Sequence, residues 1–121
     1  MVVPITRIAD YINFVNKEAE NYTFDVQSFG HAGDGNLHIY TLSNDIEKIE
    51  EFKEEVYKFM EVLYEKAYEF GGKLSGEHGI GYGKLKYLRQ FEDNLNADLM
   101  AGIKKVFDPN LILNPGKVVD L

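Results

Sequence analysis

The sequence of 121 residues has a formal net charge of −7, from 13 Lys and Arg against 20 Asp and Glu, and a pI near 4.9. This acidic balance argues against nucleic acid as a partner, and no apolar run approaches the roughly 20 residues that cross a bilayer, so no transmembrane segment is expected. The absence of Cys excludes disulfides and thiolate metal sites, so we expect a cytoplasmic protein in which His, Asp or Glu would supply any metal ligands.

The first part of the chain predicts a helix followed by a β-hairpin. Apolar residues recur at helical spacing between residues 5 and 21, which predicts an amphipathic helix with Thr6 or Asp10 as its cap. Residues 22–30 and 36–42 alternate in polarity and are rich in aromatic and β-branched side chains, so each predicts a strand. The Gly-Asp-Gly connection between them predicts that the two strands pair as a hairpin.

The longest predicted helix precedes a glycine-rich loop. Asn44 is a candidate helix cap, and a continuous apolar stripe follows it as far as Phe70, before the Gly71-Gly72 pair ends the pattern. Residues 71–83 contain six glycines, a density that no helix tolerates. We therefore expect a shaped loop there, flanking a short strand.

One more helix and an irregular tail complete the prediction. Asp93 or Asn94 is expected to cap a helix that ends at Phe107, because the proline at position 109 restricts the residue before it, and residues 111–121 are expected to be irregular. The pattern predicts an α+β fold over residues 1–121, with an antiparallel sheet and helices on one face, similar to half of a ferredoxin-like arrangement.

The three histidines all lie in the two glycine-punctuated segments. If Asp34-Gly35 form a two-residue type I′ turn, His31 lies opposite His38 on one face of the hairpin. Their Cβ atoms would then be roughly 5 Å apart, a separation from which two imidazoles can bind one metal ion.

Glu77 and His78 add a carboxylate and an imidazole on adjacent residues, which point to opposite sides in an extended backbone. Two His and one Glu form the ligand set of many catalytic zinc sites and would equally suit Mn or Fe(II). The alternative is that His31 and His38 are a hydrogen-bonded pair and that His78 is an ordinary loop residue. Both interpretations remain open on the residue types alone.

Four ordered motifs, spread over roughly residues 22–118, resemble those of a known family. They are Gly30-His31-Ala32-Gly33-Asp34-Gly35-Asn36-Leu37-His38, Ser75-Gly76-Glu77-His78-Gly79-Ile80-Gly81, Phe107-Asp108-Pro109 and Leu113-Asn114-Pro115-Gly116-Lys117. They are similar to the C-terminal domain of FAD-linked oxidases, within the vanillyl-alcohol oxidase superfamily. That family includes glycolate oxidase flavoprotein subunits, D-lactate dehydrogenases and D-2-hydroxyglutarate dehydrogenases.

The resemblance implies roles for individual residues. His31, His38 and Glu77 would bind a divalent metal, usually zinc in those relatives that have one. His78 would act as the general base on a 2-hydroxy acid, and hydride would leave the substrate Cα for N5 of FAD. Asn114 and Lys117 would contact the flavin, because their segment resembles the stretch that returns towards the cofactor in the family.

Two departures from the family pattern affect what the chain is expected to do. Tyr40 occupies a position where relatives acting on 2-hydroxyglutarate often carry an Asn that helps to hold the substrate, so the substrate is left open. The flavin-binding domain and the first half of the substrate domain have no counterpart in these residues. We therefore expect a truncated chain or one part of a split enzyme, inactive alone, with an FAD-binding domain or subunit as its partner.

Two other functions remain open on the sequence. The chain could be a non-catalytic α+β module that has lost its flavin domain and forms homo-oligomers through exposed apolar surface. It could also be a stand-alone metallohydrolase built on the two-His, one-Glu set.

Overall fold

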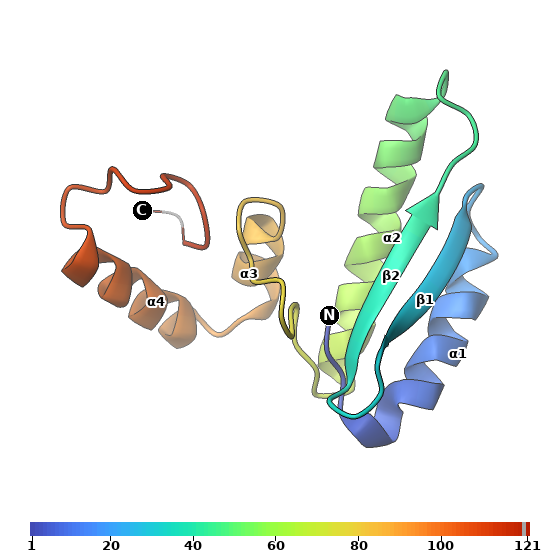
Figure 1. The fold of residues 1–121 in the computed structure, drawn as a ribbon, viewed down its shortest axis with the longest axis horizontal. Coiled ribbons are helices and arrows are strands. Elements are labelled where there is room, and N and C mark those ends of the chain that lie inside the picture. The colour runs from blue at the N-terminus through green and yellow to red at the C-terminus, as the bar shows by residue number, and fades with distance from the viewer. Residues whose placement is uncertain (120) are drawn as a thin grey trace. The chain divides into compact units, whose positions relative to one another are not determined.

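The computed structural model describes residues 1–119 and 121, which form two compact units, residues 1–76 and 77–121. The first unit contains the 3-10 helix η1 (Ile5–Arg7), α1 (Ile8–Ala19), β1 (Asp25–His31), β2 (Asn36–Leu42) and α2 (Ile49–Glu69), and the second contains α3 (Leu85–Phe91) and α4 (Asn94–Phe107) (Figure 1). The expected α+β class is confirmed.

The hairpin of β1 and β2 differs from the prediction in its turn. Its antiparallel register runs from Asp25 opposite Leu42 to His31 opposite Asn36, so the loop spans residues 32–35 rather than two residues. The amide of Gly35 donates to the His31 carbonyl at 3.1 Å, and Gly35 has a φ of 77°. The Asp34 carboxylate accepts from the amide of Asn36 at 3.0 Å, so this side chain stabilises the longer loop.

One face of the hairpin is covered by α1 and α2 (Figure 1). Alternate strand residues such as Val26 and Ile39 pack against the buried core, whose members are Val3, Tyr11, Val15, Phe24, Leu37, Phe59, Leu63 and Ala67. Phe24 meets Phe59 edge to face, with ring centroids 5.3 Å apart. The hydroxyl of Tyr11 donates to the Leu63 carbonyl at 2.7 Å, and burial raises the pKa of that hydroxyl.

Two predicted helix starts are wrong in detail. No side chain caps α1, which begins after Arg7, so neither Thr6 nor Asp10 has the predicted role. The long helix begins at Ile49 and not just after Asn44. The Asp45 side chain accepts from the amide of Glu47 at 3.0 Å, and this local hydrogen bond competes with helix formation in the segment before α2.

The short strand expected in the glycine-rich segment is reduced to an isolated bridge. Lys73 pairs with Val2, and the two residues exchange backbone hydrogen bonds of 3.0 and 2.9 Å. The bridge joins the end of α2 to the N-terminal segment and holds the chain that leads to the second unit.

In the second unit, α4 confirms one predicted cap. The Asp93 carboxylate accepts from the amide of Leu95 at 2.8 Å, as an N-cap side chain does. The helix buries none of its residues among those that the structure describes, and its apolar stripe is between 58% and 81% exposed at Leu95, Leu99, Ile103 and Phe107.

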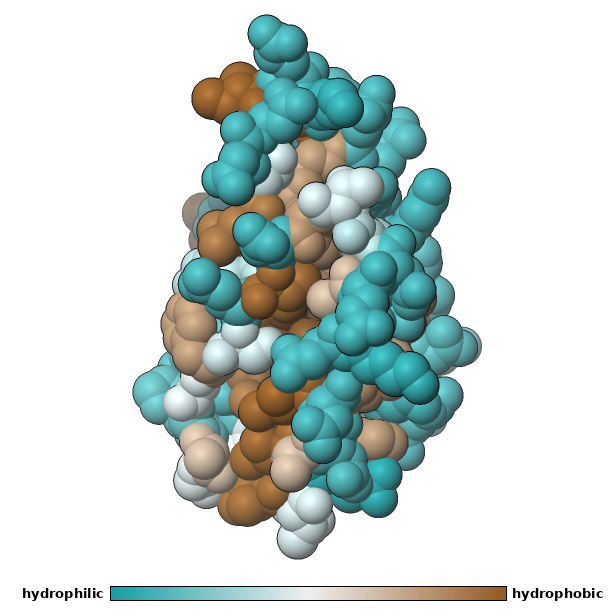
Figure 2. Space-filling model, turned by 90° about the vertical axis from the view of Figure 1, so that its right-hand side faces the viewer, coloured by the Kyte–Doolittle hydropathy of each residue, from teal (hydrophilic) through white to brown (hydrophobic). Residues whose placement is uncertain are grey.

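Apolar surface also remains open on the first unit. Figure 2 shows a band of hydrophobic side chains between hydrophilic margins, on the face that lies to the right in Figure 1.

Within the described residues, no helix combines the length and the apolar character needed to span a membrane.

Candidate metal and substrate site

His31 and His38 lie on the same face of the hairpin, the face that α1 and α2 do not cover. Their ring centroids are 5.8 Å apart and their planes meet at 78°. The predicted shared face is confirmed, but the predicted direct opposition is wrong, since His31 lies opposite Asn36 and His38 opposite Phe29. The register differs by two residues, and a shift of two leaves every side chain on its face because the strand period is two.

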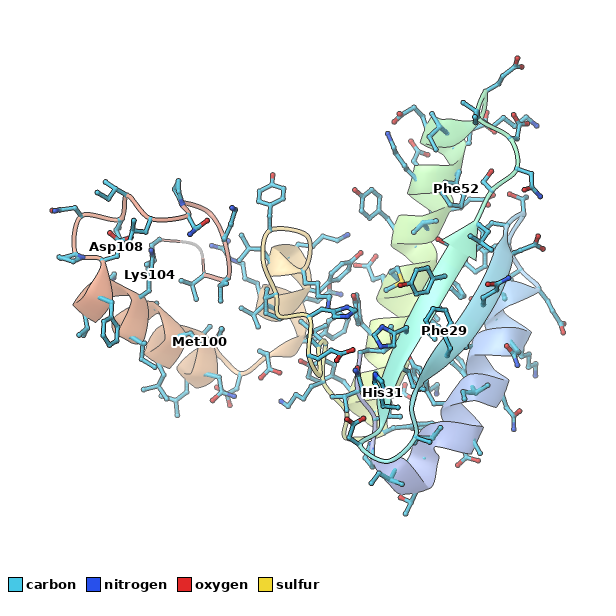
Figure 3. All side chains as sticks on the ribbon, in the orientation of Figure 1. Phe29, His31, Phe52, Met100, Lys104 and Asp108 are labelled. Atoms are coloured by element: carbon cyan, nitrogen blue, oxygen red, sulfur yellow. The ribbon has the colours of Figure 1, made fainter. Side chains whose placement is uncertain are left out.

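Phe29 supports the imidazole of His38. The two rings stack across the hairpin, with centroids 5.7 Å apart and an angle of 22° between their planes. Figure 3 shows Phe29 and His31 on β1, two positions apart and therefore on one side of the strand. His38 is half-buried and His31 is exposed at the end of the strand.

Gly76, the residue before Glu77, contacts the end of the hairpin. Gly76, the last residue of the first unit, lies against the buried side chain of Asn36, which is paired with His31. A Cβ at Gly76 would lie 2.9 Å from the Asn36 Oδ1 atom. Consecutive Cα atoms are about 3.8 Å apart, so the backbone of Glu77 starts one peptide from this contact.

The side chains of Glu77 and His78 approach each other within the second unit. Glu77 Oε1 lies 3.4 Å from His78 Nε2, and both side chains are exposed. The prediction that they point to opposite sides is wrong, because residues 76–78 form a bend and not an extended strand. The carboxylate is placed to orient this imidazole.

Asn114 and Lys117 lie together on the tail of the second unit. Lys117 Nζ donates to Asn114 Oδ1 at 2.9 Å, and Asn114 has a φ of 48°. Both residues line a cavity of about 460 Å³, with Met100, Ile103 and Leu113 among its apolar walls. An apolar cavity with an amide and an ammonium group at its side can receive a ring that carries polar edges.

Asp108 is a structural residue that sequence reasoning quoted only as part of a motif. Its buried carboxylate accepts from Lys104 Nζ and from the amides of Ile112 and Leu113, at 3.1 and 2.9 Å for the two amides. Lys104 Nζ also donates to the Leu113 carbonyl at 2.6 Å. These contacts hold the pKa of Asp108 below its usual range. Figure 3 labels Lys104 and Asp108 at the end of α4, where they fix the start of the tail. The spacing of four between a Lys and the helix-ending Asp was the signal available in the sequence.

The family described as FAD linked oxidases, C-terminal domain, matches residues 1–118. The chain belongs to this family.

Several curated relatives match this FAD-linked oxidase C-terminal domain along most of its length. It is 53% identical over 118 residues to a D-lactate dehydrogenase of Anaerostipes hadrus, covering 98% of this chain and 25% of that protein. It is 42% identical over 116 residues to the glycolate oxidase subunit GlcD of Bacillus subtilis, covering 96% and 24%. A D-2-hydroxyglutarate dehydrogenase of Xanthomonas citri is 43% identical over 97 residues, covering 80% and 21%.

The domain spans about a quarter of the length of the D-lactate dehydrogenase and of the glycolate oxidase subunit. The recognition from four motifs is confirmed by the family match.

Proposed function

We propose that the chain is the substrate-side domain of an FAD-dependent 2-hydroxy-acid dehydrogenase of glycolate or D-lactate type. It would act with an FAD-binding domain, on a small 2-hydroxy acid and in the cytoplasm. The observation that carries the proposal is the pair of imidazoles 5.8 Å apart on one open face of the hairpin, in a member of the FAD-linked oxidase family.

His31, His38 and Glu77 are the residues that would hold a divalent metal, and each offers one ligand atom. Two imidazole nitrogens and one carboxylate oxygen suit zinc and leave room for a substrate. Such an ion, when bound, supplies Lewis-acid stabilisation of negative charge on the hydroxyl oxygen of the substrate. Two contacts of this chain would orient the ligands. Phe29 stacks on His38, and the residue before Glu77, Gly76, lies against Asn36.

His78 is the proposed general base. With Nε2 beside the carboxylate of Glu77, Nδ1 is the atom that would accept the proton of the 2-hydroxyl group. The carboxylate would stabilise the imidazolium that forms, while FAD, when bound, supplies the acceptor for the hydride from Cα. Transfer of this proton to His78, together with the hydride acceptor that FAD would supply, would convert the 2-hydroxy acid into a 2-oxo acid.

Asn114 and Lys117 are proposed to contact the flavin. The cavity that they line has the apolar walls and the few polar groups that suit a ring system. Asp108 would serve indirectly, by holding the start of the segment that carries both side chains.

Metal analysis tests the ligand assignment. Purified chain equilibrated with Zn²⁺ is expected to retain about one equivalent, and His38→Ala should weaken binding by at least about 100-fold. His78→Ala removes an imidazole outside the proposed ligand set and should retain zinc with a smaller loss of affinity than His38→Ala, since it removes only a neighbour of Glu77. On addition of an FAD-binding domain, His78→Ala should then lack turnover of the 2-hydroxy acid. Equal zinc affinity in wild type and His38→Ala would remove His38 from the coordination set.

A second candidate function is an oligomerising module without catalysis, favoured by the open apolar stripe of α4. Sedimentation velocity of the chain would show a concentration-dependent oligomer under this hypothesis, and a monodisperse monomer would count against it. The two-His, one-Glu set would also suit a metallohydrolase, but membership of an oxidase family favours the oxidoreductase.

A further inference from the structure

One edge of the hairpin is unpaired along the whole of β1. The 7 residues of β1 pair with β2 on one side, and no other strand of the described residues pairs with them. The outer edge of β2 is different, because Leu37 exchanges backbone hydrogen bonds with Met1 at 2.8 and 3.0 Å. The N-terminal segment therefore covers the start of β2, whereas no described segment forms a comparable pair with β1.

The register identifies which backbone groups face the unpaired edge. Leu37 directs its N–H and C=O groups at Met1 and away from β1, and Gly30 lies opposite Leu37. In an antiparallel ladder, both residues of such a pair point outward, and the direction alternates along each strand. The N–H and C=O groups of Val26, Ser28 and Gly30 therefore point away from β2, towards the unpaired edge.

β1 lacks the features that usually stop an exposed edge from pairing with another strand. Such edges commonly carry Lys, Pro or a bulge. β1 contains no Lys, Arg or Pro, and its register with β2 runs without a bulge from Asp25 to His31. The side shown in Figure 2 is the right-hand side of Figure 1, where β1 and α1 lie, and a band of hydrophobic side chains runs along it. This side of the first unit therefore offers a partner both backbone groups and apolar surface.

The sequence of β1 is complementary to itself when two copies run antiparallel about Ser28. Asp25 then lies opposite His31 of the second copy, at each end of the pairing. An imidazole N–H group of His31 can donate to that carboxylate, and such cross-strand pairs stabilise a sheet. Val26 lies opposite Gly30 of the second copy, and Ser28 lies opposite itself. All three outward-pointing residues therefore enter hydrogen-bonded pairs.

Ser28 lies on the twofold axis of this pairing. Its Oγ atom is buried and has no hydrogen-bond partner within the described residues. In the antiparallel pair the two Ser28 Cβ atoms are about 5 Å apart, close enough for the hydroxyl groups to hydrogen-bond to each other. A buried hydroxyl without a partner costs free energy, so the pairing supplies what this atom lacks in the single chain.

We propose that the chain forms a symmetric dimer in which β1 of each copy pairs with β1 of the other. The two hairpins then form one four-stranded antiparallel sheet, two strands from each copy. The twofold axis is perpendicular to this sheet, so the helices of both copies cover the same face, and the same patch serves on both subunits. The partner is a second copy because the residues on the two sides of Ser28 complement each other in charge. The dimer does not depend on the proposed function, and its interface is not the apolar stripe of α4.

Sedimentation equilibrium and amide hydrogen exchange of the whole chain test the interface together. We expect a monomer–dimer equilibrium. The amides of Val26, Ser28 and Gly30 should exchange at least about tenfold more slowly where the dimer predominates than after dilution to the monomer. The amides of Ile39 and Thr41 point outward from β2 by the same alternation, so they are the internal control and should exchange equally fast in both states.

Substitutions in β1 assign the association to this edge. Ser28→Pro removes an N–H group that only the dimer uses, so it should raise the dimer Kd by at least about 100-fold and leave the pairing of β1 with β2 intact in amide spectra. Asp25→Asn weakens a charge pair that occurs twice in the dimer and should raise the Kd by about 2- to 30-fold. Glu54→Gln makes the same change in net charge at an exposed position of α2, so it is the matched control and should leave the Kd unchanged.

Three results would overturn this dimer. The first is a monomer at every concentration up to about 1 mM, where even weak association is measurable. The second is a dimer in which Ile39 and Thr41 become protected and the outward amides of β1 do not. The third is a dimer that Leu99→Glu abolishes and Ser28→Pro leaves intact, since its interface would then be α4. Should Ser28→Pro fail to fold, the Kd of Asp25→Asn and the exchange rates of the wild type decide the question.

Discussion

Gly76→Ala probes whether the contact at the start of the Glu77 segment controls the proposed metal site. The ideal Cβ of the new side chain would lie 2.9 Å from Oδ1, 3.1 Å from Cγ and 3.4 Å from Cβ of Asn36. The first distance is shorter than a carbon–oxygen van der Waals contact, so either Asn36 or the backbone at position 76 must move. Asn36 is only 5% exposed and pairs with His31, which leaves the backbone before Glu77 as the freer partner.

The expected effect is a loss of metal affinity without a loss of the hairpin. A displacement of a few tenths of an ångström at the Glu77 backbone is comparable with the tolerance of metal–ligand distances, about 0.2 Å. Changes that disturb the orientation of a ligand typically cost 10- to 100-fold in affinity, and we expect Gly76→Ala to raise the zinc Kd within that range. The hydrogen bonds of β1 and β2 are formed by other residues and should persist.

Zinc titration calorimetry together with amide NMR spectra of the chain measures both effects. Gly33→Ala is a matched control, since a Cβ at Gly33 in the hairpin loop meets no atom within 4 Å. The control should bind zinc as the wild type does. A folded Gly76→Ala protein with wild-type zinc affinity would refute the reasoning, because it would show that this contact does not govern the position of Glu77.

The remaining predictions concern stability and assembly. Phe59→Ala removes a fully buried ring and should lower the free energy of unfolding by about 3–5 kcal/mol in urea denaturation; a loss near that of an exposed substitution would contradict the described core. In the same assay Tyr11→Phe, which loses the hydrogen bond to the Leu63 carbonyl, should cost about 1 kcal/mol. The lowered pKa of Asp108 means that its ionised form stabilises the fold above about pH 4, and that this contribution is lost as the pH falls through the lower pKa of the folded state. The gap in melting temperature between wild type and Asp108→Asn should therefore be largest near neutral pH and narrow below about pH 4, and an equal gap throughout would contradict this. If α4 mediates self-association, Leu99→Glu should shift the sedimentation profile to monomer, and an unchanged oligomer would exclude its stripe as the interface.

Periodicity predicted the types and order of the main elements because local sequence determines them. The apolar spacing that predicts α2 extends over 21 helical residues, and a pattern of this length favours a helix over a strand or a loop. The start of that helix was missed by several residues. Short polar side chains such as Asp45 can bond to the backbone either inside or outside a helix, and only the tertiary context decides between the two.

The hairpin shows which part of a site a sequence can determine. Turn length sets which residues lie directly opposite each other, and here the side chain of Asp34 and the conformation of Gly35 produced a longer loop than the dipeptide alone predicts. The face on which a strand residue lies depends only on whether its position in the strand is odd or even. A register error of two residues therefore leaves the predicted face unchanged. The inference that His31 and His38 share a surface was therefore more robust than the opposition from which it was drawn.

For the same reason, the sequence did not predict the role of Phe29, and it predicted the apolar stripe of α4 but not the exposure of that stripe. A sequence shows that Phe29 alternates with core residues, but stacking on His38 becomes visible only when the register is known. Likewise the spacing of Leu95, Leu99 and Ile103 predicts an apolar stripe on a helix without saying what covers it. Whether such a stripe is buried depends on the surface that packs against it as well as on the helix. Each of these residues is more than half exposed, and this is the strongest reason to test the chain together with an FAD-binding domain.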